Sequence, residues 1–182
     1  MEINRIEACT VKYDTVKVSF DTIVFNKRIT LLEGINGCGK STLLKKISGV
    51  FGKTMAKSFR YALELPSYPL DLKVVDILNA FLKYDEFAKS DKQVDLINLF
   101  DFAPFLYHKC TELSKGNKMK LNLILTLQAE VDLYLLDEPF SGLDSTAKYR
   151  LSSYIKRSSS QFIITSHLKE NLFGETAEVI RL

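Results

Sequence analysis

Cysteine, proline, histidine and long apolar runs are all scarce in this chain of 182 residues, which has three cysteines, four prolines and two histidines. Cys9, Cys38 and Cys110 are odd in number and have no metal-ligand spacing, so we expect reduced thiols and not a disulfide framework. The best apolar run, residues 121–127, is interrupted by Asn122 and is far shorter than the roughly 18 residues that cross a bilayer. Any contact with a membrane is therefore expected to need a partner.

A block of one charge sign is also missing. The formal net charge is +3, with 26% charged and 46% apolar residues, which is typical of one globular domain. The lysines are scattered along the chain, and this argues against nucleic acid as the main ligand. Residues 1–14 carry charges throughout and contain no apolar leader core, so we expect a cytoplasmic protein.

Residues 34–41, GINGCGKS, match the phosphate-binding pattern G-x-x-x-x-G-K-[ST]. They follow an apolar stretch, residues 28–33, that favours a strand, and they precede a helical pattern at residues 41–48. Glycines allow backbone N–H groups to turn toward phosphates, Lys40 supplies a positive charge, and the Ser41 hydroxyl is a ligand for Mg²⁺. The sequence therefore predicts a nucleotide site, with Cys38 as a small residue within it.

The hydrophobic periodicity alternates between strands and helices, without repeats or low-complexity linkers, and predicts an α/β fold. The chain starts with a predicted antiparallel ribbon of residues 3–13 and 15–20. Further helices are expected at residues 74–84, 93–100 and 121–127, and further strands at residues 133–136, 162–165 and 178–182.

Residues 133–139, LYLLDEP, form the second informative stretch. A continuously apolar strand suits a buried parallel sheet, whose carboxyl end would bring acids beside the phosphates. Asp137 would then hold Mg²⁺ through water, and Glu138 would polarise the attacking water. A simple turn after a strand is the alternative for this pattern taken alone.

Five short motifs in order resemble the ATP-binding cassette (ABC) ATPases. They are GINGCGKS as Walker A, LSKGN at residues 113–117 as a variant signature, LYLLDEP as Walker B, SGLD at residues 141–144 as the D-loop, and TSH at residues 165–167 as the switch histidine. The resemblance implies a P-loop NTPase cassette with a mixed central sheet, an N-terminal antiparallel ribbon and an inserted helical subdomain. It places the ATP-binding core at residues 1–64 and 121–182 and the helical subdomain at about 65–120.

The resemblance also implies roles for individual residues in binding and hydrolysing ATP. Glu138 would be the general base, His167 the sensor of the γ-phosphate, and Lys40 a ligand of the β- and γ-phosphates. Tyr13 would stack on adenine, although a tyrosine that packs across strands has the same signature. The nucleotide-binding segment of the P-loop would comprise Gly34, Ile35, Asn36, Gly37, Cys38, Gly39, Lys40, Ser41 and Thr42.

In such proteins two cassettes pair head to tail, so that the signature of one closes the ATP site of the other. Ser114 and Gly116 would contribute from the start of a helix, and Asp144 from the D-loop. The implied partners are a second cassette, in a homo- or heterodimer, and an integral membrane permease at the inner face of the cell membrane. No nucleic-acid partner is expected.

Two departures from the family pattern bear on activity. No glutamine lies between Thr42 and Lys92, and Glu64 takes the place where the family carries a metal-contacting glutamine. We expect Glu64 at the metal to slow turnover or make it depend on a partner, because like charges repel. The lysine in LSKGN favours an exporter by analogy.

Other classes of cassette protein are alternatives to a transporter subunit. The 74 positions between Lys40 and Ser114 (114 − 40) leave no room for the long coiled coil of DNA-repair members. Translation factors of the family carry two cassettes, whereas this chain has one. A soluble ATPase in metallocluster assembly remains the alternative to a transporter subunit. A nucleotide-binding regulator that does not hydrolyse ATP is a third hypothesis.

Overall fold

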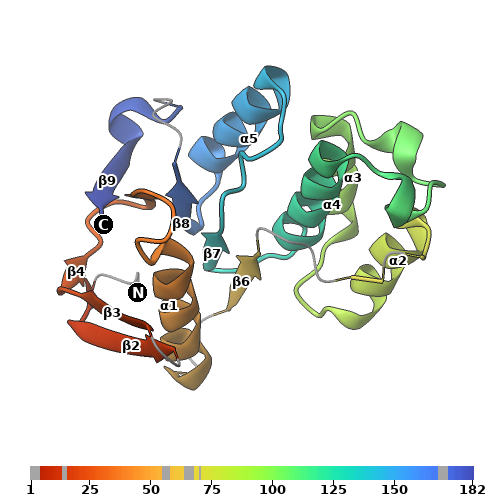
Figure 1. Cartoon of the computed structure of the whole chain (residues 1–182). Coiled ribbons are helices and arrows are strands. Elements are labelled where there is room, and N and C mark those ends of the chain that lie inside the picture. The colour runs from red at the N-terminus through yellow and green to blue at the C-terminus, as the bar shows by residue number, and fades with distance from the viewer. Residues whose placement is uncertain (1–4, 14–15, 55–57, 64–67, 70, 168–171) are drawn as a thin grey trace.

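The computed structural model describes residues 5–13, 16–54, 58–63, 68–69, 71–167 and 172–182 (Figure 1). Its central sheet has five strands in the order β6-β7-β8-β5-β9. These strands are β6 Phe59–Ala62, β7 Leu133–Leu136, β8 Gln161–Ser166, β5 Ile29–Glu33 and β9 Ala177–Arg181. All four pairings are parallel, so the prediction of an α/β fold is confirmed and the prediction of a mixed sheet was wrong for the described strands.

The antiparallel strands form two small ribbons outside the central sheet, and this separation explains why the sheet is not mixed. Strand β2 (Cys9–Tyr13) pairs with β3 (Val16–Phe20), as the sequence predicted. Strand β1 (Arg5–Ile6) pairs with β4 (Ile23–Val24). Figure 1 shows the β2–β3 ribbon next to α1.

The α-helices agree with the predicted ones but are mostly longer. They are α1 Lys40–Thr54, α2 Val74–Tyr84, α3 Ser90–Leu99, α4 Lys115–Leu127 and α5 Ser145–Arg157. Short 3₁₀ turns are η1 Ala103–Phe105, η2 Cys110–Glu112 and η3 Gly174–Thr176. Helix α5 and strands β4 and β6 were not predicted. None of the helices in the described ranges combines the length and the apolar character that crossing a bilayer requires.

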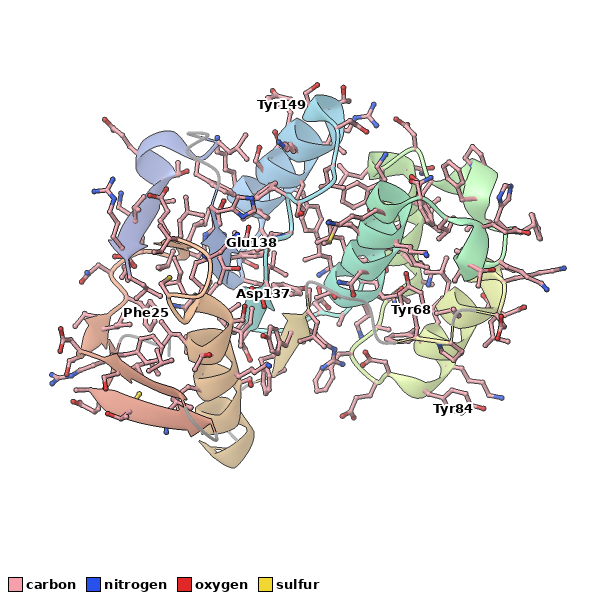
Figure 2. All side chains as sticks on the ribbon, in the orientation of Figure 1. Phe25, Tyr68, Tyr84, Asp137, Glu138 and Tyr149 are labelled. Atoms are coloured by element: carbon pink, nitrogen blue, oxygen red, sulfur yellow. The ribbon has the colours of Figure 1, made fainter. Side chains whose placement is uncertain are left out.

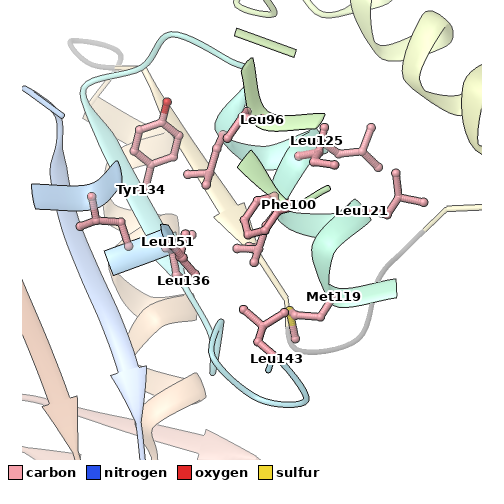
Figure 3. Packing of buried hydrophobic residues seen from close by; sticks show 14 of the residues in the cluster. Leu96, Phe100, Met119, Leu121, Leu125, Tyr134, Leu136, Leu143 and Leu151 are labelled. Atoms are coloured by element: carbon pink, nitrogen blue, oxygen red, sulfur yellow. The ribbon is translucent and has the colours of Figure 1, made fainter. Parts of the chain in front are cut away.

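Both faces of the sheet are buried, because helices and ribbons cover it from the two sides. Along β7, Leu133 and Leu135 pack in the cluster that contains Leu43 and Leu44 of α1. Side chains alternate along a strand, so Tyr134 and its neighbour Leu136 enter the opposite cluster, with side chains from α2, α3, α4 and α5. Figure 3 shows part of that second cluster, in which Leu96, Phe100, Leu121, Leu125 and Leu151 are labelled around the same space. Burial on both faces explains why β7 is continuously apolar and why β5 and β8 are mostly apolar.

The parallel arrangement brings the carboxyl ends of β5, β7 and β8 to one edge. Glu33 at the end of β5 is in register with Ser166, and Leu136 at the end of β7 with Ile164. The loops that follow these strands carry the P-loop, the two Walker B acids and His167. This edge is the place where ligands bind in open α/β sheets.

Candidate functional site

The P-loop connects β5 to α1 and depends on glycine at two places. Gly37 and Gly39 have φ angles of 85° and 105°, a region that side chains other than glycine rarely adopt. A Cβ on Gly39 would also lie 2.6 Å from Cγ1 of Val18. At Gly34 a Cβ would lie 2.5 Å from Sγ of Cys38, so this half-buried thiol packs on the first glycine of the motif.

Lys40 is folded back onto its own loop. Its Nζ donates to the carbonyl oxygens of Gly34 at 2.7 Å and Ile35 at 3.2 Å. The same Nζ lies 3.9 Å from Oε1 of Glu138, and only 7% of the lysine side chain is exposed. The Lys40 ammonium group therefore lies beside the loop that would bind phosphates and close to Glu138, the second Walker B acid.

Ser41 and Asp137 meet at the start of α1. The Ser41 hydroxyl donates to Oδ1 of Asp137 at 3.1 Å, and the same carboxylate oxygen accepts from Oγ1 of Thr165 at 2.7 Å. Asp137 is 5% exposed. Two oxygen-bearing side chains predicted as metal ligands are thus adjacent, although 96 positions separate them in the sequence.

Glu138 and His167 form the outer part of the same network. Nδ1 of His167 lies 2.8 Å from Oε2 of Glu138, whose side chain is 12% exposed against 47% for the histidine. Glu138 has a φ of 50°, which is uncommon for a residue with a side chain and is found at sites where surrounding contacts hold the backbone. Figure 2 labels Asp137 and Glu138 in the middle of the molecule, beside the loop that leads into α1.

The signature motif and the D-loop contact each other. Ser114 caps α4 by accepting a hydrogen bond from the Asn117 N–H at 3.2 Å. A Cβ on Gly116 would lie 2.6 Å from the carbonyl oxygen of Gly142, so the backbones touch there. Within the described residues, no hydrogen bond or ion pair joins Ser114 or Gly116 to the P-loop of the same chain.

Asp144 ends the D-loop and begins α5. Its Oδ1 accepts from the Ala147 N–H at 2.8 Å, and Lys120 Nζ of α4 lies 3.4 Å from its Oδ2. The hydrogen bond from Ala147, together with Lys120, holds the pKa of Asp144 below its ordinary value. Asp144 therefore joins the D-loop to both α4 and α5.

The remaining candidates differ in how far the structure describes them. Thr42 is half-buried in α1, Asn36 is exposed, and the Ile35 side chain is 81% exposed. Tyr13 ends β2, but its side chain lies outside the described part, so its contact with adenine stays a prediction. Glu64 lies outside the described residues altogether, and its role at a metal also stays a prediction.

Sequence reasoning did not find the role of Thr165, which contacts both Walker B residues. Its hydroxyl bonds to Asp137, and it also accepts from the backbone N–H of Glu138 at 2.8 Å. Only the proximity of Thr165 to His167 in TSH gave a signal. The other histidine, His108, pairs with Glu112 four residues along the chain and takes no part in this network.

A cavity of about 620 Å³ opens between the P-loop and the end of β8. Its lining includes Gly34, Ile35 and Asn36 on one side and Ser166 and His167 on the other. The P-loop is thus accessible on the side where Ser166 and His167 lie.

Comparison with known proteins agrees with the geometry of the site. The family model described as ABC transporter matches residues 18–141, which is more than half of the chain. An uncharacterised ABC transporter ATP-binding protein of Methanocaldococcus jannaschii is 32% identical over 170 residues, covering 86% of this chain and 63% of that protein. The zinc import ATP-binding protein ZnuC of Acinetobacter baylyi is 29% identical over 166 residues, with 85% and 62% covered.

A solved ABC transporter ATP-binding protein from Pyrococcus furiosus has the same fold, with a TM-score of 0.77 at 24% identity and 96% of both chains covered. The chain spans about three fifths of the length of the two curated relatives above. The matched region contains the P-loop, the signature and Walker B in the order that the sequence predicted. The chain therefore belongs to the ABC transporter family and has the fold of its ATP-binding cassettes.

Proposed function

We propose that this chain binds ATP with Mg²⁺ at the P-loop and hydrolyses it as the ATP-binding subunit of an ABC transporter. The observation that carries the proposal is a network of side chains at the carboxyl ends of the central strands. In this network Lys40 Nζ lies 3.9 Å from Glu138 Oε1, and the Ser41 hydroxyl donates to Asp137 Oδ1 at 3.1 Å. A lysine, a hydroxyl and two carboxylates beside a helix N-terminus match the needs of phosphoryl transfer, which are positioning and charge stabilisation. Family membership supports the same activity.

Binding of ATP would move Lys40. Its Nζ now bonds to two P-loop carbonyls, and phosphate oxygens would replace them as stronger, charged acceptors. Because the glycines have no side chains, phosphate oxygens can approach the backbone N–H groups of the P-loop. The dipole of α1 also favours an anion at the N-terminus of that helix. The lysine is therefore kept near its working position before the nucleotide arrives.

The residues fit Mg²⁺ by their chemistry. Mg²⁺ prefers oxygen ligands and usually takes one or two from protein and the others from phosphate and water. Ser41 Oγ and Asp137 Oδ1 would hold it directly or through water, and Glu64 is a further proposed contributor. The ion, when bound, would neutralise charge that develops on the phosphates.

For hydrolysis, Glu138 would accept a proton from the attacking water. The His167 Nδ1 lies 2.8 Å from Oε2 of Glu138, and the His167 backbone N–H donates to the same oxygen at 3.4 Å, so both contacts would orient the carboxylate. The other oxygen, Oε1, lies toward Lys40. When Lys40 moves to phosphate, Oε1 becomes available to water, which couples nucleotide binding to activation of the base.

A second cassette would complete the site. Gly116 lies against the D-loop, Ser114 caps α4, and neither has a bond to its own P-loop among the described residues. The Ile35 side chain, 81% exposed at the mouth of the P-loop cavity, is an apolar surface that a second cassette would cover. These features support a head-to-tail pair in which each signature closes the other chain's nucleotide.

A membrane permease is the proposed transport partner, and it would place this chain at the inner face of the cell membrane. A cavity of about 150 Å³ between β6 and the helices, lined by Tyr61, Leu63, Tyr68 and Phe81, is a candidate contact for it. Two observations bear on the direction of transport. The lysine-containing signature favours export, whereas relatives named as zinc import proteins favour import.

Copurification separates transport from the soluble alternative. For this test the affinity-tagged chain is expressed at its natural level. We expect an integral membrane protein to copurify with it only when detergent micelles keep that protein in solution. Retention of a soluble scaffold protein, with or without detergent, would instead support metallocluster assembly.

The nucleotide site itself is tested by two lysine variants on one helix. Lys40→Ala is expected to weaken binding of a fluorescent ATP analogue by at least about tenfold, because it removes the charge beside the phosphates. Lys45→Ala, which changes an exposed lysine of α1, is the matched control and should bind like the unchanged chain. Equal binding by both variants would contradict a site at the P-loop.

A further inference from the structure

We infer that Thr165 is a positioning residue that locks the two Walker B carboxylates into their working geometry. The inference rests on the proposed ATPase function and deepens it, because it assigns a third residue to the same site. Thr165 lies in β8, two residues before His167, and is completely buried.

The Thr165 hydroxyl makes a hydrogen bond to each of the two carboxylate residues, Asp137 and Glu138. Thr165 Oγ1 donates its proton to Oδ1 of Asp137 at 2.7 Å and accepts the backbone N–H of Glu138 at 2.8 Å. Its donor and acceptor capacities are thus used on two consecutive residues. A valine would have nearly the same shape and could do neither.

The location in the sheet explains why a side chain is needed there. Leu136, the last residue of β7, is in register with Ile164, so Thr165 lies beside the point where the chain leaves the sheet. On the other side, the Asp137 N–H donates to the carbonyl oxygen of Ala62 on β6 at 2.9 Å. The end of β7 is therefore fixed from β6 by the backbone and from β8 by the Thr165 hydroxyl.

The backbone of Glu138 depends most on this contact. Its φ of 50° takes the chain out of the sheet direction and leaves the N–H in need of another acceptor. Thr165 supplies that acceptor, and two residues later His167 contacts the Glu138 side chain at 2.8 Å. The end of β8 thus sets the backbone of Glu138 through Thr165 and its carboxylate through His167.

Asp137 is oriented by the same hydroxyl. Its Oδ1 is shared between Ser41 and Thr165, so losing the Thr165 bond would let the carboxylate turn toward or away from the serine. We therefore expect Thr165 to govern both the response to Mg²⁺ and the rate of hydrolysis, although it touches no reacting atom.

The test compares Thr165→Val with Thr165→Ser, which restores the hydroxyl. The matched control is Thr30→Val. Thr30 is also completely buried in a strand of the same sheet, but its hydroxyl donates to Glu178 at 2.7 Å and does not contact Asp137 or Glu138. Three measurements are made on the full chain: amide hydrogen exchange at Glu138, the Mg²⁺ dependence of ATP-analogue binding, and kcat with KM for ATP.

In Thr165→Val the Glu138 amide is expected to exchange about tenfold faster, because it loses its buried acceptor. The Mg²⁺ concentration for half-maximal binding should rise, and kcat should fall about ten- to a hundredfold with KM for ATP nearly unchanged. Thr165→Ser and Thr30→Val should both behave like the unchanged chain. If Thr165→Val does not fold, Thr165→Ala at low temperature gives the same comparison.

The inference is overturned if Thr165→Val keeps the normal exchange rate, Mg²⁺ response and kcat, or if the serine variant fails to restore them. Failure of the proposed function looks different. In that case the unchanged chain neither binds nor hydrolyses ATP, while amide exchange at Glu138 still separates the valine variant from the serine variant.

Discussion

At the residue scale, the three cysteines occupy environments that predict distinct reactivities. Cys38 lies in the P-loop and is half-buried, whereas Cys110 is completely buried and burial raises its pKa. The thiolate is the reactive form, so a buried thiol with a raised pKa reacts slowly. Cys9, half-buried in the ribbon strand β2, lies outside the P-loop and provides a control within the same chain.

We predict that ATP protects Cys38 from alkylation. Bound phosphates would cover the P-loop, so labelling of Cys38 by a maleimide should slow by at least about tenfold at saturating ATP. Peptide mass spectrometry measures each thiol separately: Cys9 should label at the same rate with and without ATP, and Cys110 should stay unlabelled in the folded chain. Unchanged labelling of Cys38 would argue against nucleotide at this loop.

Asp144 gives a pH-dependent prediction at the same scale. Its folded-state pKa is lowered by the Ala147 N–H and by Lys120, so its stabilising effect is present above the unfolded-state pKa of about 3.9 and is lost as pH falls through the lower folded-state value. Urea denaturation should show Asp144→Asn less stable than the unchanged chain at pH 7. This difference should shrink on acidification below about pH 4. A difference that grows in acid would contradict the sign of the shift.

At the element scale, the contact between α4 and the D-loop depends on a residue without a side chain. A Cβ on Gly116 would meet the Gly142 carbonyl at 2.6 Å, and Figure 3 shows Met119 of α4 beside Leu143 in the adjoining core. We predict that Gly116→Ala lowers the free energy of unfolding by about 1–3 kcal/mol, as overpacking does. Urea denaturation measures this change.

Gly49 in the middle of α1 is the matched control for that variant. A Cβ on Gly49 would meet nothing within 4 Å, and alanine favours helix over glycine. Gly49→Ala should therefore stabilise the chain by up to about 1 kcal/mol. Loss of stability in both variants would show that the contact with Gly142 is not the cause.

Most elements around the site could be predicted because their signals are local. Strand β7 is a continuous apolar run, β5 is mostly apolar, and α2 has the predicted bounds Val74–Tyr84. Helix α5 was missed although it has a signal, since Asp144 caps it and Ala147, Leu151 and Ile155 are buried at helical spacing. Strand β6 is only four residues long and its sequence FRYA includes a charged arginine, so it is defined by its pairing with β7 and carries little signal of its own.

The sequence predicts the residues of the candidate site but not several of the contacts between them. Lys40 bonds to backbone carbonyls of Gly34 and Ile35, and every residue type carries such carbonyls. Thr165 contacts Asp137 only because β7 and β8 are adjacent in the sheet order, which short motifs do not encode. The bounds of the helical subdomain, about 65–120, stay a prediction.

At the scale of the whole molecule, the described contacts leave the P-loop and the signature as separate surfaces. Lys40, Ser41, Asp137, Glu138 and His167 belong to one network, while Gly116 and Asp144 belong to the contact between α4 and the D-loop. A second copy arranged head to tail would bring each signature to the other copy's nucleotide. The proposed function therefore requires that ATP itself joins two cassettes, and two copies of this chain can be tested directly.

The most direct test is the mass of Glu138→Gln in solution, measured by light scattering after gel filtration with and without Mg²⁺ and ATP. The glutamine cannot accept the proton of water, so bound ATP should persist. We expect a monomer without nucleotide, and with nucleotide a dimer that retains one ATP per chain. Glu138→Gln that holds ATP but stays monomeric would contradict the composite site.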